Sequence, residues 1–382
     1  MNDPIMVSLF QTQPEAHLWS WALAVWGGLT AALVSLIIIL TQAWHGRYSV
    51  DHTHGIQKVH ASSVCRVGGV ALALGLGVEA WQWDDAGGSH LLQNLLLAAV
   101  PVFALGLFED ISRKVSPLAR LLAAFASAGL LIVLTGVQLQ RTGLVWPDAL
   151  LVSHAVSIPL TLFAVAGVTH AVNIIDGQHG LACFTVGIIL LAFAAIAHAQ
   201  LDAELAQLLF YIVAVLLGFG VFNWPWGRLF LGDGGAYLLG FAVAALALLI
   251  LNRLPQVHPF ALLLACFHPV FETLFSIWRR WHHAVAVSKP DRLHLHSLLL
   301  RRVVRPRLAR SHRHAANAIT GLLCSALTLL AVLTADHPWA PLLAQLFMTL
   351  LYLSVYARIV RFQWCTPWVM FAHPFRAKSQ HS

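Results

Sequence analysis

Eleven long apolar runs constrain the fold of this sequence more than any other feature. Each approaches the 20 or so residues that a helix needs to cross the hydrocarbon core of a bilayer. Charged residues make up only 10% of the 382-residue chain, whereas soluble domains carry roughly a quarter, so lipid must cover much of the surface. The sequence therefore predicts an all-α, polytopic membrane helix bundle of about 11 transmembrane helices. The expected spans are residues 18–41, 66–82, 91–108, 118–137, 154–172, 181–199, 205–222, 234–251, 258–278, 317–335 and 340–360.

The distribution of Lys and Arg predicts how the bundle is oriented. If the N-terminus lies outside and every run crosses once, all 23 basic residues except Arg141 and Arg253 fall on the cytoplasmic side. An excess of basic residues in cytoplasmic loops is the rule for membrane proteins, so the C-terminus is expected in the cytoplasm. The first run is too long for a signal peptide and lacks a basic n-region, which indicates a retained helix.

Composition and the distribution of charge indicate how many domains the chain has and which partners it binds. Residues 1–382 are expected to form a single domain, because no linker, low-complexity tract or internal repeat interrupts the pattern. The formal net charge is +7, but its one-sided distribution indicates anionic lipid head groups and phosphorylated substrates rather than nucleic acid. The five cysteines are scattered without paired spacing, which argues against disulfides and a Cys-based zinc site.

Polar residues that could bind a ligand or take part in a reaction gather on the predicted cytoplasmic side. The outside loops are short and contain little chemistry, whereas each inside loop holds Asp, Asn, His, Lys or Arg in or beside a stretch with Gly. In a helix bundle, the inside loops would meet at one face, where a water-soluble substrate and a lipid head group could also meet. The inside loops are residues 42–65, 109–117, 173–180, 223–233 and 279–316.

The first inside loop carries Asp51, Lys58 and His60, and Arg66 and the glycine pair 68–69 follow it. Lys is a compact point charge suited to phosphate, and a glycine pair lets backbone approach a ligand or a neighbouring helix. An interfacial anchor of basic residues beside lipid head groups explains the same residues without a binding site.

Two adjacent carboxylates, Glu109 and Asp110, open the second inside loop. Carboxylates at the end of a membrane helix are costly unless they are paired or coordinated. A cation relieves the repulsion between close carboxylates, which favours a Mg²⁺ site or a general base. The alternative is salt bridging to Arg113 and Lys114, which follow directly.

The third and fourth loops place further carboxylates among glycines. Asn173, Asp176 and His179 follow one apolar run, and Asn223 and Asp233 lie between the next two. A carboxylate at a Gly-rich helix start suits a hard cation such as Mg²⁺, which also takes phosphate oxygens. Asn and Asp at such positions can instead serve only as helix caps.

The fifth loop is long, basic and rich in histidine, with Asp291, Arg292, His294 and His296 followed by Ser297. A cluster of this kind beside carboxylates is a plausible diphosphate clamp. His-x-His is also compatible with zinc, although the neighbouring carboxylates favour Mg²⁺. A basic cytoplasmic loop without a ligand is the third reading.

These motifs, in this order, resemble the polyprenyl-phosphate N-acetylhexosamine-1-phosphate transferases over about residues 20–360. The polysaccharide-initiating branch is the more similar one, because the last motif is not a run of adjacent histidines. Departures from the family pattern are Thr53, Gln57, Glu109, His179 and Ser297. The matching residues are Asp51, Lys58, His60, Gly68, Gly69, Asp110, Asn173, Asp176, Gly177, Gly180, Asn223, Phe230, Gly232, Asp233, Gly235, Asp291, Arg292, His294 and His296.

The resemblance implies transfer of a sugar-1-phosphate, expected to be N-acetylhexosamine-1-phosphate, from a UDP-sugar to undecaprenyl phosphate, which starts a cell-envelope polysaccharide and releases UMP. It implies Mg²⁺, or Mn²⁺ in its place, bound by Asp233 with Asp110. It implies catalytic roles for Glu109, Asp110 and Asp176. Substrate-binding roles are implied for Lys58, His60, Asn173, His179, Asn223, Arg292, His294 and His296.

Two other readings stay open. The changes at His179 and Ser297 are compatible with a non-catalytic family member that binds the lipid carrier or a partner protein. A transporter would account for the helix count, but transporters usually place polar groups near the bilayer midplane and often contain repeats. The resemblance is also compatible with a homodimer, because the family often dimerises.

Overall fold

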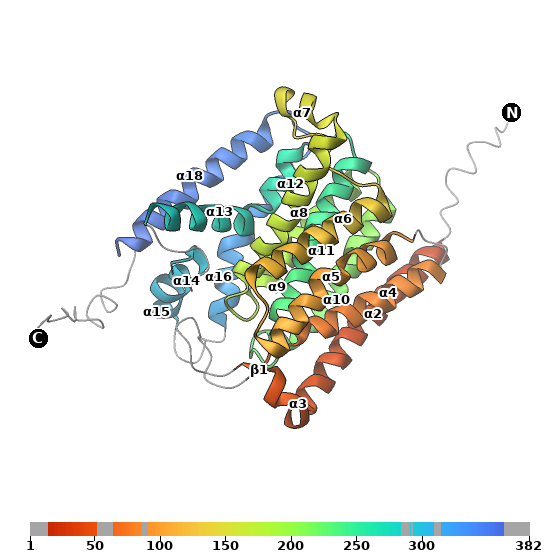
Figure 1. The fold of residues 1–382 in the computed structure, drawn as a ribbon, viewed down its shortest axis with the longest axis vertical. Coiled ribbons are helices and arrows are strands. Elements are labelled where there is room, and N and C mark those ends of the chain that lie inside the picture. The colour runs from red at the N-terminus through yellow and green to blue at the C-terminus, as the bar shows by residue number, and fades with distance from the viewer. Residues whose placement is uncertain are drawn as a thin grey trace, which may run out of the picture.

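The computed structural model describes residues 14–51, 64–85, 90–283, 291, 293–308 and 315–362, and these residues form a helix bundle. Figure 1 shows long helices running side by side, with short helices and loops gathered at both ends. The first half contains α2 (Pro14–Leu40), α3 (Gln42–Ser49), α4 (Gly68–Asp85), α5 (Leu91–Ser112), α6 (Pro117–Thr135), α7 (Val145–Leu151) and α8 (His154–Ile175). The second half contains α9 (Leu181–Ala199), α10 (Ala203–Asn223), α11 (Gly232–Arg253), α12 (Pro259–Ala265), α13 (Phe267–His282), α14 (Leu295–Leu298), η1 (Leu299–Val304), α15 (Arg305–Arg307), α16 (Ala316–Ser325), η3 (Ala326–Leu329), α17 (Leu330–Thr334) and α18 (Ala340–Val360).

All eleven predicted runs are helical, but the predicted number of spans is not confirmed. In the part of the chain that the structure describes, eight helices are long and apolar enough to cross a membrane. The bent pair α12–α13 makes a ninth if it counts as one span. Helix α2 is apolar over Ala24–Leu40, and α4 carries Glu79, Asp84 and Asp85 within its 18 residues.

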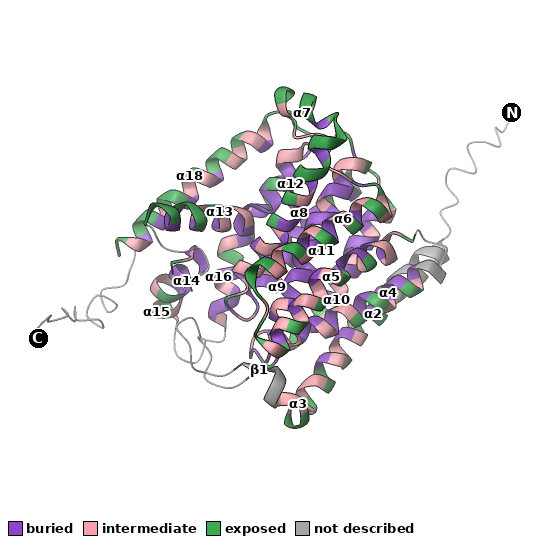
Figure 2. Cartoon of the chain, in the orientation of Figure 1, coloured by how far each residue is buried: buried purple, intermediate pink, exposed green. Residues whose placement is uncertain are grey.

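Helix α11 is the centre of the bundle. It packs against α4, α5, α8 and α9, and 89% of its most apolar 18-residue window is buried, compared with 22% for α6 and α18. Glycines permit this crowding, because a Cβ at Gly106 of α5 would lie 2.7 Å from the Cα of Gly234. Figure 2 shows the buried interior along α9, α10 and α11 and the exposed outer surfaces of α6 and α18.

A short extended segment joins the first polar loop to the fourth. Strand β1 (Val50–Asp51) pairs antiparallel with β2 (Val64–Cys65), and Cys65 forms a parallel bridge with Leu229. The Gly68 and Gly69 N–H groups then donate to the Phe230 and Leu231 carbonyls at 3.0 and 2.9 Å. The glycine pair therefore serves close approach to a neighbouring segment, one of its two predicted uses.

The ninth predicted run does not continue straight. Helices α12 and α13 meet at a bend of 79°, and α13 turns its charged side inward. Leu274, Ile277, Trp278 and Trp281 are exposed along one stripe of α13, whereas Glu272, Ser276, Arg279 and Arg280 on its other side are buried. An apolar outer face with aromatic residues suits contact with lipid at a membrane surface, and the polar inner face is available to the histidine loop.

Candidate functional site

The site lies at the end of the bundle where α5 and α8 end and α11 begins, which we call the motif end. Asp233, in the first turn of α11, has a partly exposed carboxylate with three polar neighbours. Asn173 Nδ2 donates to its Oδ1 at 3.2 Å and Arg120 Nη1 to its Oδ2 at 3.2 Å, while Arg66 Nη2 lies 3.5 Å from Oδ1. The N-cap of α11 is Leu231, so the cap-only reading of Asp233 is not supported.

Asp110 holds the beginning of α11 in place. Its Oδ1 accepts the Asp233 N–H at 2.8 Å and its Oδ2 accepts the Gly234 N–H at 2.9 Å. A carboxylate at a helix N-terminus satisfies free N–H groups and is favoured by the helix dipole. Gly232 has a φ of 74°, and a Cβ there would lie 2.5 Å from Asp110 Oδ2. Asp110 also lies 3.4 Å from Arg66 Nη2, rather than pairing with the Lys and Arg that follow it in sequence.

Glu109 and Asp110 therefore do different things, although they are adjacent in sequence. Asp110 is 1% exposed, and both of its oxygens contact backbone N–H groups of α11. Glu109 Oε2 accepts the Val115 N–H at 2.8 Å and closes the turn after α5. The catalytic role of Glu109, and the catalytic and metal-binding roles of Asp110, stay predictions.

Two arginines complete the carboxylate cluster, and neither was among the predicted site residues. Arg66 bridges Asp110 and Asp233, and Arg120 reaches Asp233 from the first turn of α6. A sequence signal for Arg120 did exist. Ser116 caps α6 and Pro117 follows it, so Arg120 places a positive charge at a helix start, where the dipole disfavours cations. Such a charge requires a compensating anion.

The loop after α8 brings a third carboxylate to the cluster. Asp176 is the C-cap of α8. Burial raises the pKa of Asp176 well above its usual range, the negative charges of Asp233 and Asp110 add to this rise, and Arg66 opposes it. A cation bound beside these carboxylates would relieve the repulsion between their negative charges. The cluster therefore favours additional positive charge despite its two arginines.

The rest of that loop is tied to the scaffold. Asn223, 2% exposed, accepts the Gly180 N–H at 2.6 Å and donates to the Leu229 carbonyl at 2.9 Å. His179 lies 6.4 Å from Phe230 with nearly parallel rings. Asn317 of α16 donates to the His179 carbonyl at 3.2 Å, with its Nδ2 3.1 Å from the ring Nδ1. The predicted substrate contacts of Asn223 and His179 are untested, and Asn223 clearly joins two loops.

The histidine loop reaches the same end of the bundle. Gln178 Nε2 donates to the His296 carbonyl at 3.3 Å, and a Cβ on Gly177 would lie 3.4 Å from His296 Nε2. His294 and His296 have parallel rings with centroids 5.3 Å apart. Burial lowers the pKa of His296 to about 3, so this ring is neutral near pH 7 and cannot act as a fixed positive charge for phosphate.

Glu272 of α13 holds this loop in place, and its position in the sequence is also unusual. It is a lone carboxylate in an apolar run, and such residues are functional candidates by default. Glu272 is 0% exposed and accepts from His294, Leu295 and Tyr352. Three predicted substrate-binding residues, Lys58, His60 and Arg292, lie outside the described residues.

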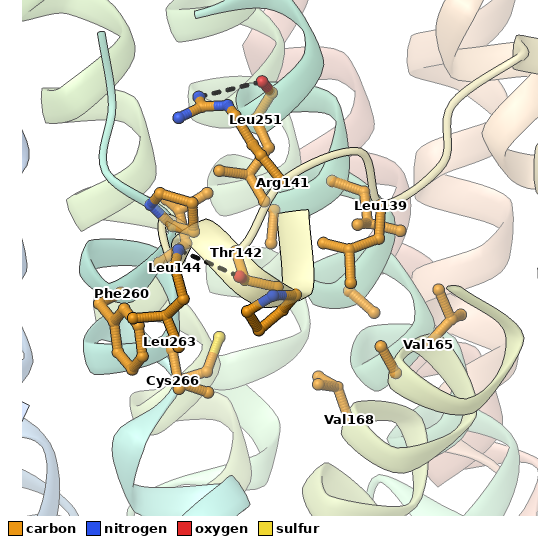
Figure 3. A pocket seen from close by; sticks show the side chains of 17 residues that line it. Leu139, Arg141, Thr142, Leu144, Val165, Val168, Leu251, Phe260, Leu263 and Cys266 are labelled. Atoms are coloured by element: carbon orange, nitrogen blue, oxygen red, sulfur yellow. Dashed lines mark hydrogen bonds between the residues drawn. The ribbon is translucent and has the colours of Figure 1, made fainter. Parts of the chain in front are cut away.

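An apolar pocket of about 370 Å³ lies away from the motif end, between α8, α11 and α12. Figure 3 shows Val165 and Val168 on one wall and Leu263 and Cys266 on another. Arg141 stands at its rim and turns its guanidinium away to the Leu251 carbonyl at 3.2 Å. The lining is almost entirely apolar, which suits a hydrocarbon chain rather than a polar ligand.

The sequence of this chain is similar to those of known transferases. Residues 92–251 match the profile of the glycosyl transferase family 4. A probable undecaprenyl-phosphate N-acetylglucosaminyl 1-phosphate transferase of Bacillus subtilis is 29% identical over 252 residues, which cover 64% of this chain and 68% of that protein. A decaprenyl-phosphate N-acetylglucosaminephosphotransferase of Mycobacterium leprae is 24% identical over 345 residues, 81% of this chain and 82% of that protein.

A third relative matches a shorter stretch more strongly. A phospho-N-acetylmuramoyl-pentapeptide-transferase of Heliobacterium modesticaldum is 42% identical over 110 residues, 29% of this chain and 33% of that protein. The matched profile contains Asp110, Asn173, Asp176 and Asp233, which converge in the structure. The chain is a multi-pass membrane protein, and over the matched residues it is similar to polyprenyl-phosphate N-acetylhexosamine-1-phosphate transferases.

Proposed function

We propose that this protein transfers N-acetylhexosamine-1-phosphate from a UDP-sugar to undecaprenyl phosphate, with UMP as the second product, and so starts a cell-envelope polysaccharide. The observation that carries the proposal is the Asp233 carboxylate at the start of α11, partly exposed among Arg66, Arg120 and Asn173. Phosphoryl transfer requires positioning and charge neutralisation more than covalent help from the protein. This cluster offers both signs of charge at one end of a membrane bundle.

The bond changes follow from the substrates. An oxygen of the lipid phosphate forms a bond to the β-phosphorus of the UDP-sugar, and the bond from that phosphorus to the bridging oxygen breaks, so that UMP leaves with the electron pair. A phosphate monoester loses its second proton near pH 6, so the acceptor is largely a dianion at neutral pH. The carboxylates and arginines then serve mainly to hold charges at the correct places.

The residues present fit a divalent cation that is shared with the substrate. The ligand atoms that Asp233 and Asp176 offer are carboxylate oxygens, which Mg²⁺ and Mn²⁺ prefer. Among the described residues, no three His, Cys, Asp or Glu side chains are grouped to hold an ion by themselves. Mg²⁺ is typically bound by one or two carboxylates together with substrate phosphates. Asp233 would hold the ion, and the ion would neutralise charge on the diphosphate.

The two arginines are placed to change partners when charges arrive. Arg66 and Arg120 lie against the Asp233 carboxylate at 3.5 and 3.2 Å. A cation on that carboxylate would weaken their attraction to it and leave their N–H groups for phosphate oxygens, which suit the planar guanidinium. Arg120 therefore belongs to the proposed substrate-binding group, together with Asn173 and His294.

The apolar pocket fits part of the acceptor's hydrocarbon chain. Val168 precedes Asp176 by eight residues, which places the pocket wall about 12 Å from the carboxylate cluster along α8. A polyprenyl chain whose phosphate is at the motif end can run along α8 to this pocket without leaving the membrane. The basic bias of the loops supports a cytoplasmic motif end in a bacterial inner membrane, with the N-terminus outside.

Release of UMP tests the proposed function. Purified protein in nanodiscs with undecaprenyl phosphate and Mg²⁺ is supplied with several UDP-N-acetyl sugars, and UMP and the lipid product are measured. Wild-type protein is expected to form both, and Asp233→Asn to form neither. The matched control is Asp202→Asn, because Asp202 also pairs with an arginine, Arg253, but at the opposite end of α11.

The control variant should keep wild-type transfer, since Asn caps a helix nearly as well as Asp. Undiminished transfer by Asp233→Asn would overturn the proposed metal site. Lack of UMP release from every UDP-sugar, with lipid phosphate still bound, would instead favour the non-catalytic lipid-binding reading that His179 and Ser297 leave open.

A further inference from the structure

Glu272 is a charged group buried where α13, α18 and the histidine loop meet. Its Oε1 lies 2.9 Å from His294 Nδ1, its Oε2 accepts from the Tyr352 hydroxyl at 2.8 Å, and both oxygens accept from the Leu295 N–H. A fully buried carboxylate is costly unless donors surround it, and several donors favour the ionised form. The three donors here come from two segments far apart in sequence.

The Glu272 contact defines which nitrogen of His294 carries a proton. A carboxylate can only accept hydrogen bonds, so the Nδ1 of His294 is the donor. The other ring nitrogen, Nε2, lies 3.8 Å from Asp291 Oδ2, beyond a direct hydrogen bond, and the side chain of His294 is 12% exposed. Nε2 is therefore the atom through which His294 can contact a ligand.

A second set of contacts braces the same loop from α13 and α18. Arg279 contacts the Asp291 carboxylate and donates to the Leu293 carbonyl at 2.8 Å and the Tyr356 hydroxyl at 2.5 Å. Ser276 also donates to Asp291 at 3.0 Å. Both tyrosines are on one face of α18, one helical turn apart. The segment before His294 and the segment after it are thus each fixed to the same two helices.

The loop connects this brace to the carboxylate cluster. His294 stacks on His296, and His296 touches the 176–180 loop through Gln178 and Gly177. Asn173 lies near the end of α8, directly before this loop, and its side chain contacts Asp233. The orientation of His294 is therefore set on one side by Glu272 and on the other by the loop that borders Asp233.

We propose that Glu272 is a positioning residue of the transferase site, which keeps the proton of His294 on Nδ1 and presents the unprotonated Nε2, a hydrogen-bond acceptor, to a hydroxyl or amide N–H group of the bound UDP-sugar. The inference rests on the proposed function for the identity of the substrate. The state of His294 does not depend on it. Residues of this kind, which orient a functional histidine from behind, typically change activity by about 10- to 100-fold when removed.

The kinetic test compares two buried glutamates. Glu272→Gln keeps the shape and removes the charge, and kcat for sugar-phosphate transfer is expected to fall about 10- to 100-fold with little change in KM for the lipid. Tyr352→Phe removes one donor to Glu272, with an expected loss of about fivefold. The matched control is Glu79→Gln, because Glu79 is also 0% exposed and accepts from a backbone N–H, that of Gly27 in α2.

A spectroscopic test reads the histidine directly and does not require activity. Long-range ¹H–¹⁵N spectra of ¹⁵N-histidine-labelled protein in nanodiscs at pH 8 report which ring nitrogen carries the proton. The signal of His294 is identified by its loss in His294→Gln. The expected result is a neutral His294 protonated at Nδ1 in the wild-type protein.

Each outcome separates positioning from a purely structural role. Protonation of wild-type His294 at Nε2 would overturn the proposal, whatever the activity. An Nδ1 proton combined with wild-type kcat in folded Glu272→Gln would also overturn it, because Glu272 would then only stabilise the fold. If wild-type protein transfers no sugar phosphate but His294 is protonated at Nδ1, the proposed function fails while the orientation by Glu272 stands.

Discussion

Asp110 and Asp233 belong to different helices, yet the side chain of Asp110 accepts the backbone N–H of Asp233 at 2.8 Å. The carboxylate of α5 thus caps α11 from outside and fixes where the Asp233 carboxylate lies. Arg66 lies between the two, 3.4 and 3.5 Å from their Oδ1 atoms. The position of the proposed metal ligand therefore depends on a residue that itself has both oxygens engaged.

Replacing Asp110 with Asn should disturb Asp233 without touching it. One carboxylate oxygen becomes an NH₂ group that faces a backbone N–H, so two donors oppose each other in a buried place. The cost of such an unsatisfied group is about 1–3 kcal/mol of unfolding free energy. We expect a lower melting temperature in nanodiscs and a loss of transfer larger than tenfold.

Glu109→Gln is the comparison for Asp110→Asn. Glu109 accepts a single N–H, from Val115, and the amide oxygen of Gln can replace that contact, so the melting temperature should change little. Activity that falls in Glu109→Gln at full stability would support a direct catalytic role for Glu109. Wild-type stability and activity in Asp110→Asn would contradict the capping role.

Arg120→Gln should affect metal and nucleotide in opposite directions. Removal of this cation leaves the Asp233 carboxylate with less positive charge nearby, so Mn²⁺ should bind more tightly in the absence of substrate. The same change removes a guanidinium from the phosphate site, and KM for the UDP-sugar should rise about tenfold or more, as expected for loss of a charge-assisted hydrogen bond. Electron paramagnetic resonance of Mn²⁺ and steady-state kinetics measure the two effects.

Lys114→Gln is the control for Arg120→Gln, because Lys114 is an exposed cation at the motif end. It should change neither quantity by more than the general loss of one surface charge. Equal weakening of Mn²⁺ and UDP-sugar in Arg120→Gln would show that Arg120 supports the fold of the site rather than balancing Asp233.

Filling the apolar pocket should distinguish acceptors by chain length. Val168→Phe adds volume at a wall of the 370 Å³ pocket, and KM should rise for undecaprenyl phosphate but not for a short-chain polyprenyl phosphate that ends before the pocket. Leu217→Phe, on the 65% exposed position of α10, is the control. Equal effects of Val168→Phe on both acceptors would contradict a pocket for the chain.

Asp291 should make stability depend on acidity at low pH. Burial is the largest single effect and raises the pKa of Asp291. The hydrogen bond from the Leu293 N–H and the charges of His294 and Arg279 together outweigh burial, so the pKa is lowered overall. A lowered pKa in the folded state contributes stability above the ordinary value of 3.8, and this contribution is lost as pH falls through the lowered pKa. Asp291→Asn should therefore be less stable at pH 6, by about 3 kcal/mol.

The difference between wild-type protein and Asp291→Asn should shrink towards pH 3, when melting is followed in nanodiscs across this range. Asp336→Asn, an exposed position in the turn before α18, should leave melting unchanged at every pH. A wild-type advantage that stays constant from pH 6 to pH 3 would argue against ionisation of Asp291 as its source.

Most of the helical framework follows from the sequence because it depends on local properties. Apolar runs about 20 residues long must satisfy their backbone hydrogen bonds internally in lipid, and all eleven predicted runs are helical. Two of these runs, the one in α4 and the one in α12 and α13, depart from a simple span, and the sequence indicated this only in part. The carboxylates of α4 reduce its apolar character, and the 79° bend before α13 places Glu272 beneath the histidine loop instead of inside a straight span.

The composition of the site was also largely predictable, whereas its connections were not. Asp110, Asn173, Asp176 and Asp233 were identified from the sequence and converge in the structure. Arg120 was not, because its place in the first turn of α6 indicates a nearby anion without identifying it, and its partner Asp233 is 113 residues away. Sequence reasoning treated Glu109 and Asp110 as one pair, but successive residues of a helix point in different directions, and only Asp110 reaches α11.

The sequence by itself determined that this protein is a membrane helix bundle whose chemistry gathers in its polar loops, because hydrophobic length and charge distribution act over short stretches of chain. Only the tertiary structure decided which groups act on which. The capping of α11 by Asp110, the arginines around Asp233 and the orientation of His294 by Glu272 join residues between 22 and 167 positions apart. Such contacts depend on the packing of whole helices against one another.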